Sequence, residues 1–157
     1  MRKMQSRKAV SPVISTVILV AVAITVAVAV AYWMGGIAGQ YTKFEKVEIQ
    51  TGICTYNSSD TVWQIQMKLK NTGTATSTMV AAFINDVEVQ NYGQSTFVVN
   101  GTATDMDPTA TTITSGETYT INFWIELGYQ NLSAGTTVNI KIHSAGGMDY
   151  IKLVELV

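Results

Sequence analysis

The sequence predicts an α+β chain in which one long apolar helix at the N-terminus is followed by an all-β domain. Two observations predict this class. Residues 9–42 contain no charged side chain, and the 25 residues from Val10 to Met34 are nearly all Val, Ala, Ile and Leu. After Lys43, apolar and polar residues alternate with a period of two, which is typical of half-buried strands. The 115 residues from Lys43 to Val157 are enough for one ordinary core.

The apolar segment is long enough to cross a membrane as a helix, because a bilayer core about 30 Å thick needs ~20 apolar residues. Twelve of its residues are Val, Ile or Leu, which favour insertion by roughly 4 to 7 kcal/mol in total. In lipid a helix leaves no backbone group unpaired, and this outweighs the weak helix propensity of Val and Ile. Pro12 fits a helix that begins at Val10, because its missing N–H would fall in the first turn.

Small residues recur at every fourth position of this helix, and only Leu19 interrupts the row of Ser11, Ser15, Ala23, Ala27, Ala31, Gly35 and Gly39. Such a row lets helix backbones approach closely. We therefore predict a helix-assembly surface that comprises Pro12, Ala23, Ala27, Ala31, Gly35 and Gly39. The alternative is that Ala and Gly are simply common in apolar helices. The glycines near residues 35 to 39 are expected to mark a joint with the outer domain, because each lowers helix stability by ~1 kcal/mol.

The first eight residues carry four positive charges and no negative one. By the positive-inside rule this end stays cytoplasmic and the C-terminal domain lies outside. A secretory signal has an apolar region of only about 7 to 15 residues before its cleavage site. The apolar segment here is longer, so cleavage after it is not expected.

The junction between the basic stub and the helix reads Arg7-Lys8-Ala9-Val10-Ser11-Pro12-Val13-Ile14. It resembles the class III signal peptide of archaeal type IV pilins over about Lys8 to Gly36. The resemblance implies that residues 1–9 are removed by a prepilin peptidase that cuts between Ala9 and Val10, so Lys8, Ala9 and Val10 are the predicted processing residues. Residues 10–42 would then form the membrane and filament-core helix. The acidic fifth residue of bacterial type IV pilins is absent, since Ile14 stands there.

Short strands are predicted at intervals along residues 43–157, and Trp63, Ile65, Met67 and Leu69 share one face of the clearest of them. Asn85-Asp86 fits a two-residue hairpin turn. About seven or eight antiparallel strands indicate an immunoglobulin-like sandwich. The predicted ranges are 47–53, 61–70, 79–84, 87–90, 97–99, 118–127, 137–143 and 150–157. Residues 102–114 show no clear period, and residues 128–135 read as a loop.

The sequence contains no recognisable catalytic constellation, and we expect no enzyme activity, no cofactor and no metal site. His143 is the single His, and Cys54 is the single Cys, which excludes an intrachain disulfide. Asp105 and Asp107 lack the spaced ligands and closing Glu of a calcium loop. Without residues 1–9 the chain has six Lys and Arg against eleven Asp and Glu, which argues against nucleic acid as a partner.

Three Asn-X-Ser/Thr sequons lie in loop-like positions of the domain that is predicted to be outside, at Asn57, Asn100 and Asn131. They are candidate N-glycosylation sites. The alternative is that these residues are polar turn residues without glycans.

The pilin resemblance implies a structural subunit whose cleaved helices bundle into the core of an extracellular filament on an archaeal surface, with a role in adhesion. It also implies partners: many copies of itself, the prepilin peptidase, an assembly ATPase with its membrane platform protein, and the membrane before assembly. Two other hypotheses stay open. One is an uncleaved single-span protein with a ligand-binding sandwich, and the other is an archaellin of a motility filament. A membrane-anchored enzyme is the weakest alternative.

Overall fold

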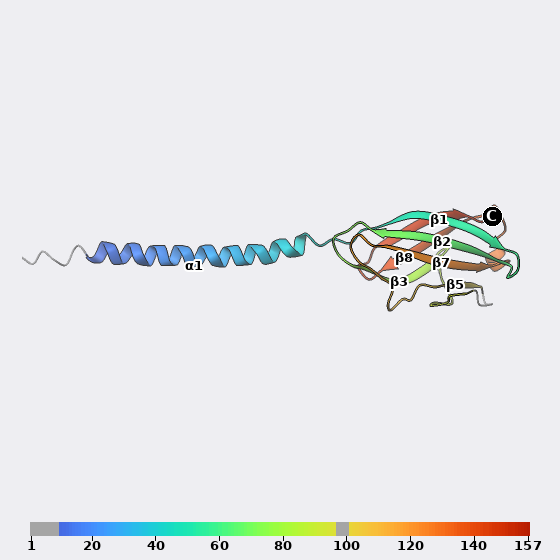
Figure 1. Ribbon diagram of the computed structural model, residues 1–157, viewed down its shortest axis with the longest axis horizontal. Coiled ribbons are helices and arrows are strands. Elements are labelled where there is room, and N and C mark those ends of the chain that lie inside the picture. Colours follow the sequence, from blue (N-terminus) through green and yellow to red (C-terminus); the bar gives the residue numbers. More distant parts are fainter. Residues whose placement is uncertain (1–9, 97–100) are drawn as a thin grey trace, which may run out of the picture. The chain divides into compact units, whose positions relative to one another are not determined.

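The computed structural model describes residues 10–96 and 101–157, which form one α-helix, nine β-strands and a short 3₁₀ helix (Figure 1). The chain divides into two compact units between Thr42 and Lys43. The elements are α1 (Val10–Tyr41), β1 (Val47–Asn57), β2 (Val62–Asn71), β3 (Ser77–Ile84), β4 (Val87–Glu88), β5 (Thr102–Thr104), β6 (Thr112–Ile113), β7 (Thr118–Glu126), η1 (Tyr129–Asn131), β8 (Thr137–Ser144) and β9 (Asp149–Glu155).

Helix α1 has 32 residues and a length of about 48 Å at 1.5 Å per residue. The helix continues through Gly35, Gly36 and Gly39 to Tyr41, and the Thr42 N–H donates to the Ala38 carbonyl at 3.2 Å. A Cβ added at any of these three glycines would meet nothing within 4 Å. The chain's own packing therefore gives no reason for glycine at these positions.

The second unit is a sandwich of two antiparallel sheets. One sheet has the strand order β1-β2-β7-β5, and the other has the order β4-β3-β8-β9, with β6 also paired to β3. These orders correspond to strands A-B-E-D facing C′-C-F-G, which is the arrangement of an immunoglobulin-like sandwich. The predicted fold class, a long apolar helix followed by a β-sandwich, is confirmed.

Strand β2 lies in the middle of its sheet, between β1 and β7. Trp63, Ile65, Met67 and Leu69 are at most 1% exposed, whereas Gln66 and Lys68 between them are exposed. The predicted face of this strand is therefore confirmed. The alternation follows from the pleat, because successive side chains of a strand point to opposite faces of the sheet.

The hairpin from β3 to β4 turns at the two predicted residues. Asn85 and Asp86 have φ values of 50° and 63°, and Ile84 pairs with Val87 across the turn. Two consecutive residues with positive φ are typical of the tight hairpin turns that Asn and Asp tolerate. The Asn85 side chain also accepts from the Asn139 N–H at 2.9 Å, which ties the turn to β8.

The strand predictions agree with the structure to within about two residues at each end, except at β1, β5 and β6. β1 extends beyond the expected end at Ile53, because its pairing with β2 continues to Asn57, which lies opposite Val62. β5 and β6 lie within residues 102–114, where the sequence shows no clear period and no strand was predicted. They bring the strands of the described residues to nine, more than the seven or eight expected. The strand expected at residues 97–99 lies outside the described residues.

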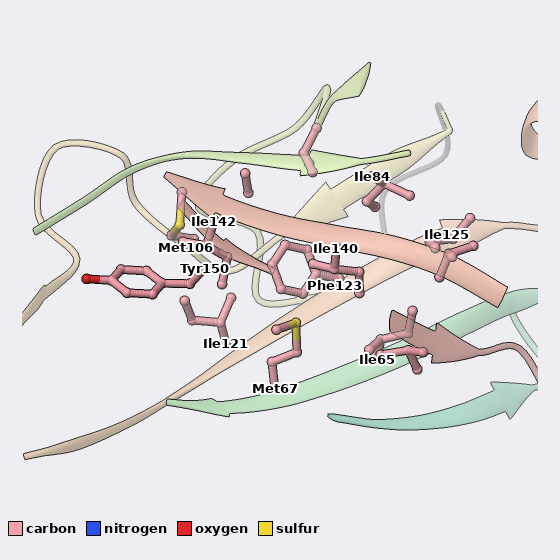
Figure 2. Close-up of a cluster of buried hydrophobic side chains, with 14 of the residues drawn as sticks. Ile65, Met67, Ile84, Met106, Ile121, Phe123, Ile125, Ile140, Ile142 and Tyr150 are labelled. Carbon is pink, nitrogen blue, oxygen red and sulfur yellow. The ribbon is translucent and has the colours of Figure 1, made fainter. Parts of the chain in front are cut away.

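The core lies between the two sheets and is built almost entirely from Ile, Leu, Val, Met and Phe. Figure 2 shows side chains from both sheets meeting there, with Phe123 of β7 beside Ile140 of β8. All its members come from residues 47–156. The sandwich thus encloses a complete hydrophobic core without α1.

Trp124 is only 7% exposed, but it belongs to a separate cluster with Val62 and Ala103. Its neighbours in β7, Phe123 and Ile125, belong to the main core, so Trp124 lies on the opposite face of the sheet. Trp124 therefore does not share the main core with Trp63. Cys54 is partly buried against that core, and this burial raises the pKa of its thiol.

The segment that leads into β1 is held to the turn after β2. The Phe44 N–H donates to the Thr74 hydroxyl at 3.0 Å, and the Phe44 carbonyl accepts from the N–H groups of Thr74 and Ala75. The Lys46 carbonyl accepts from the N–H groups of Thr72 and Gly73 at 2.8 and 3.0 Å.

Between Phe44 and Lys46, the Glu45 carboxylate accepts from the hydroxyls of Ser77 and Tyr150. Residues 44–46 are thus part of the sandwich. The stretch between the end of α1 and these contacts is limited to Thr42 and Lys43.

Gly73→Ala is expected to destabilise the sandwich, because an added Cβ would lie 2.6 Å from both the Lys46 nitrogen and the Phe44 oxygen. These are backbone atoms of the bonded segment, so relief requires the segment to shift, at a cost of about 1 to 3 kcal/mol. Urea unfolding of a fragment spanning residues 43–157 measures this, with Thr76→Ala on the same turn as the matched control. Equal midpoints for the two variants would show that the contact is adjustable.

Candidate functional site: an exposed apolar helix

The candidate site is the surface of helix α1, which is apolar on all sides and uncovered. Within Pro12–Tyr41, the most apolar 18-residue window of the helix has a mean hydropathy of 2.9, and none of this window is buried. From Val13 to Val30, its Val, Ile and Leu side chains are about half exposed or more, and Leu19 reaches 70%. A soluble surface helix keeps a polar face toward water. A helix without one has to be covered by lipid or by other proteins.

The threonine hydroxyls within α1 have partners in the helix itself. The Thr16 hydroxyl donates to the Val13 carbonyl and the Thr25 hydroxyl donates to the Ala21 carbonyl, each at 2.8 Å. These bonds matter because a hydroxyl that enters an apolar medium unpaired costs several kcal/mol. Both threonines can therefore be buried in lipid or in a helix bundle without losing a hydrogen bond.

The predicted small-residue row winds slowly around α1, because each step of four residues turns by about 40° more than a full turn, and its alanines Ala23, Ala27 and Ala31 therefore share one side of the helix. A shallow groove along this helix is formed by Ser15, Ile18, Leu19, Val22 and Ala23. It includes the row residues Ser15 and Ala23 and, between them, Leu19, which interrupts the row. Ala23, Ala27 and Ala31 are all exposed. The row is thus available for packing, and its use as an assembly surface stays a prediction.

Tyr32, Trp33 and Tyr41 lie in the C-terminal third of α1 and are 87%, 65% and 85% exposed. Large amphipathic rings at the end of an apolar span suit the membrane–water interface. At the other end, Val10 is the first residue of α1, while Lys8 and Ala9 lie outside the described residues. The expected cleavage between Ala9 and Val10 therefore stays a prediction.

The polar residues that could carry chemistry have structural partners instead. The Asp105 carboxylate accepts from the Asn122 backbone and side-chain amides at 2.8 and 2.7 Å. The Asp107 carboxylate accepts from the Thr109 hydroxyl and N–H, which hold the pKa of Asp107 below its usual value. These bonds tie loops together, as expected for turn residues.

His143 lies in β8, where its Nδ1 is 2.6 Å from the Asp149 carboxylate of β9. Sequence reasoning did not find this pair, because the two residues meet only through the register of β8 with β9. Within the described ranges, no group of three or more His, Cys, Asp or Glu side chains is placed to hold a metal ion.

The sequons at Asn57 and Asn131 both lie at exposed positions next to ends of elements, at the end of β1 and at the end of η1. The third, at Asn100, lies outside the described residues. The use of these residues as glycosylation sites stays a prediction.

No protein-family model matches the chain, and no curated protein matches it either. Among solved structures, it is similar to the archaellum periplasmic stator protein FlaG from Sulfolobus acidocaldarius, with 18% identity and a TM-score of 0.43 over 71% of this chain and 100% of that one.

It is also similar to a chain of the archaeal flagellum of Methanospirillum hungatei, with 14% identity and a TM-score of 0.48 over 98% of this chain and 94% of that one. A further match is the Sulfolobus acidocaldarius stator complex of FlaF and FlaG, with 18% identity and a TM-score of 0.42 over 71% and 90% of the two chains. At these values the likeness assigns no function, which has to follow from the chain's own residues.

Proposed function

We propose that this chain is a structural subunit of an extracellular archaeal filament of the type IV pilin kind, with surface adhesion as its role. The observation that carries the proposal is that the two units differ in how their apolar side chains are buried. Helix α1 is apolar on all sides and none of its most apolar window is buried, while the sandwich has a complete core of its own. The helix is thus the part that needs other molecules, and the sandwich is the part that can face water.

The proposed mechanism is an exchange of surroundings for α1. Lipid covers the helix first, and neighbouring copies of the same helix cover it in the filament, because an all-round apolar surface suits both. The length of about 48 Å also exceeds the roughly 30 Å of a bilayer core. The part of the helix beyond the bilayer would gain by packing against other subunits, whereas a lone span would leave it exposed.

The pilin-like junction supports the remaining steps. A prepilin peptidase would remove the basic stub, an assembly ATPase with its membrane platform protein would move the helix out of the membrane, and the sandwiches would form the outer sheath. No cofactor is needed for these steps by this chain. The precursor would be a membrane protein with a cytoplasmic N-terminus, and the mature form would lie in the filament on the cell surface.

The mature chain is expected to begin at Val10. Replacing Lys8 or Ala9 with Leu should block processing, because it alters the junction, yet should leave membrane insertion intact, because the span is unchanged. Intact-mass measurement of membrane and surface fractions checks both results. Gln5→Leu is the matched control, since it adds the same side chain away from the junction.

Assembled material that retains residues 1–8 would contradict the pilin proposal. An uncleaved chain that stays in the membrane and forms no filament would support the single-span hypothesis instead.

A further inference from the structure

An apolar pocket of about 500 Å³ opens at the pole of the sandwich where β1 ends and β2 begins. Its walls include Tyr56, Leu127, Leu132 and Val157. The Tyr56 ring lies 6.0 Å from the ring of the buried Trp63, and the Trp63 indole N–H donates to the Val157 carbonyl at 2.8 Å. These contacts give the pocket a fixed wall, while Tyr56 and Leu127 remain 43% and 51% exposed.

Two of the sequons adjoin this pocket from different loops. Asn57 directly follows the wall residue Tyr56. Asn131 begins the sequon Asn131-Leu132-Ser133, whose second and third residues both line the pocket. A sugar attached to Asn131 would therefore start at the pocket's rim.

The two Asn side chains differ in what they already bind. The Asn57 Nδ2 donates to the Asp60 carboxylate at 2.7 Å, and its Oδ1 accepts from the Ser59 N–H at 3.0 Å. Asn131 is exposed, and its side-chain amide has no hydrogen-bond partner among the described residues. Its backbone is fixed by hydrogen bonds of the loop, from the Asn131 N–H to the Gly128 carbonyl and from the Leu132 N–H to the Tyr129 carbonyl.

We propose that Asn131 carries an N-linked glycan and that the first sugar of this glycan lies in the apolar pocket. The C–H face of a sugar ring is apolar, and it gains by leaving water for the surfaces of Tyr56, Leu127 and Leu132. The pocket is mostly apolar, so it suits this face of the ring, while the sugar hydroxyls on the other side stay in solvent.

The attachment needs an activated sugar carried on a lipid phosphate. The bond between C1 of the sugar and the phosphate oxygen breaks, and the lipid phosphate leaves with that oxygen and the bonding electrons. The Asn131 Nδ2 forms the new bond to C1 and loses one amide proton. A free amide at Asn131 can enter this reaction without breaking a bond of the fold, whereas the Asn57 amide would first have to leave Asp60.

The site is tested on the full-length chain purified from its own host, by intact mass and by mass spectrometry of the peptide that contains Asn131. The expected result is a sugar on Asn131 that is lost in Ser133→Ala and kept in Ser133→Thr, since the sequon accepts either hydroxyl. Asn57→Gln should leave this peptide unchanged. An unmodified Asn131 in the wild-type chain would overturn the proposal.

Packing in the pocket is tested by thermal unfolding of four chains: wild type, Asn131→Gln, Tyr56→Ser, and the double variant. Loss of the glycan should lower the thermal unfolding midpoint of the wild-type chain by about 2 to 4 °C. It should lower the midpoint of Tyr56→Ser by clearly less, because the ring against which the sugar packs has already been removed. Equal losses in both backgrounds would show that the glycan does not occupy the pocket.

The inference rests on the proposed location of the sandwich on the extracellular side of the membrane, but it does not need filament assembly. Filaments of chains that start at Val10 and lack sugar on Asn131 would overturn the glycan proposal and leave the filament proposal standing. Uncleaved, unassembled chains that carry the sugar would overturn the filament proposal and leave the glycan proposal standing.

Discussion

Replacing Ala23 and Ala27 together by Leu is expected to abolish filaments while membrane insertion and cleavage stay normal. Leu is more apolar than Ala, so the helix should insert at least as well. The added volume would push neighbouring backbones apart, at a cost of about 1 to 3 kcal/mol per site, and the cost recurs in every subunit. Electron microscopy of cell surfaces measures filament yield, and intact mass measures cleavage.

Val26→Leu is the control for this experiment, because it adds volume to an exposed residue of α1 outside the row. It should reduce filament yield less than Ala27→Leu alone does. A wild-type yield from the double variant would remove the row from the assembly mechanism and leave the junction at Ala9 as the main local support for a pilin.

Truncating Met67 or Leu69 to Ala is expected to destabilise the sandwich by about 2 to 5 kcal/mol, because each buried side chain would leave a cavity in a close-packed core. Both side chains are 0% exposed and face the second sheet from the middle strand β2. Urea unfolding of the fragment 43–157 gives the free energy of unfolding, and this fragment contains every residue of the core.

The matched controls are Gln66→Ala and Lys68→Ala, which lie on the same strand and are exposed. Their free energies should change by less than about 0.5 kcal/mol. Comparable losses on the two faces of β2 would mean that the outer face is also covered in solution.

The elements with strong local signals could be predicted from the sequence. Local sequence patterns predict three of them: the helix from the apolar segment Val10 to Met34, strand β2 from its alternation, and the hairpin turn from Asn85-Asp86. These signals depend on neighbours in the sequence, so no knowledge of distant contacts was required.

The elements that were missed depend on distant contacts. Thr102 and Thr104 of β5 are buried because β5 pairs with β7, and a run of Thr-Ala-Thr gives no apolar alternation to reveal this. The position of Trp124 on the outer face of its sheet likewise follows from the register of β7 with β2. Such placements emerge only when the strands are assembled.

The candidate site divides in the same way. The small-residue row and the junction at Lys8-Ala9-Val10 are properties of the sequence, and both were visible there. The pocket beside Asn131 was not, because Tyr56, Leu127 and Val157 come from three distant parts of the chain. The Asn57 side chain is hydrogen-bonded, whereas the Asn131 side-chain amide has no partner among the described residues, and this difference also required the structure.

The hydrogen bonds of residues 44–46 to the turn at 72–75 have a mechanical consequence for a filament subunit. Force applied at Lys43 first loads these hydrogen bonds and then loads β1, whose ladder with β2 extends from Val47 to Asn57. Antiparallel ladder bonds lie across the strand direction, so they are loaded side by side in shear and share the force. Tension that reaches the sandwich through this linkage would therefore stretch many bonds at once, instead of opening the sheet one bond at a time.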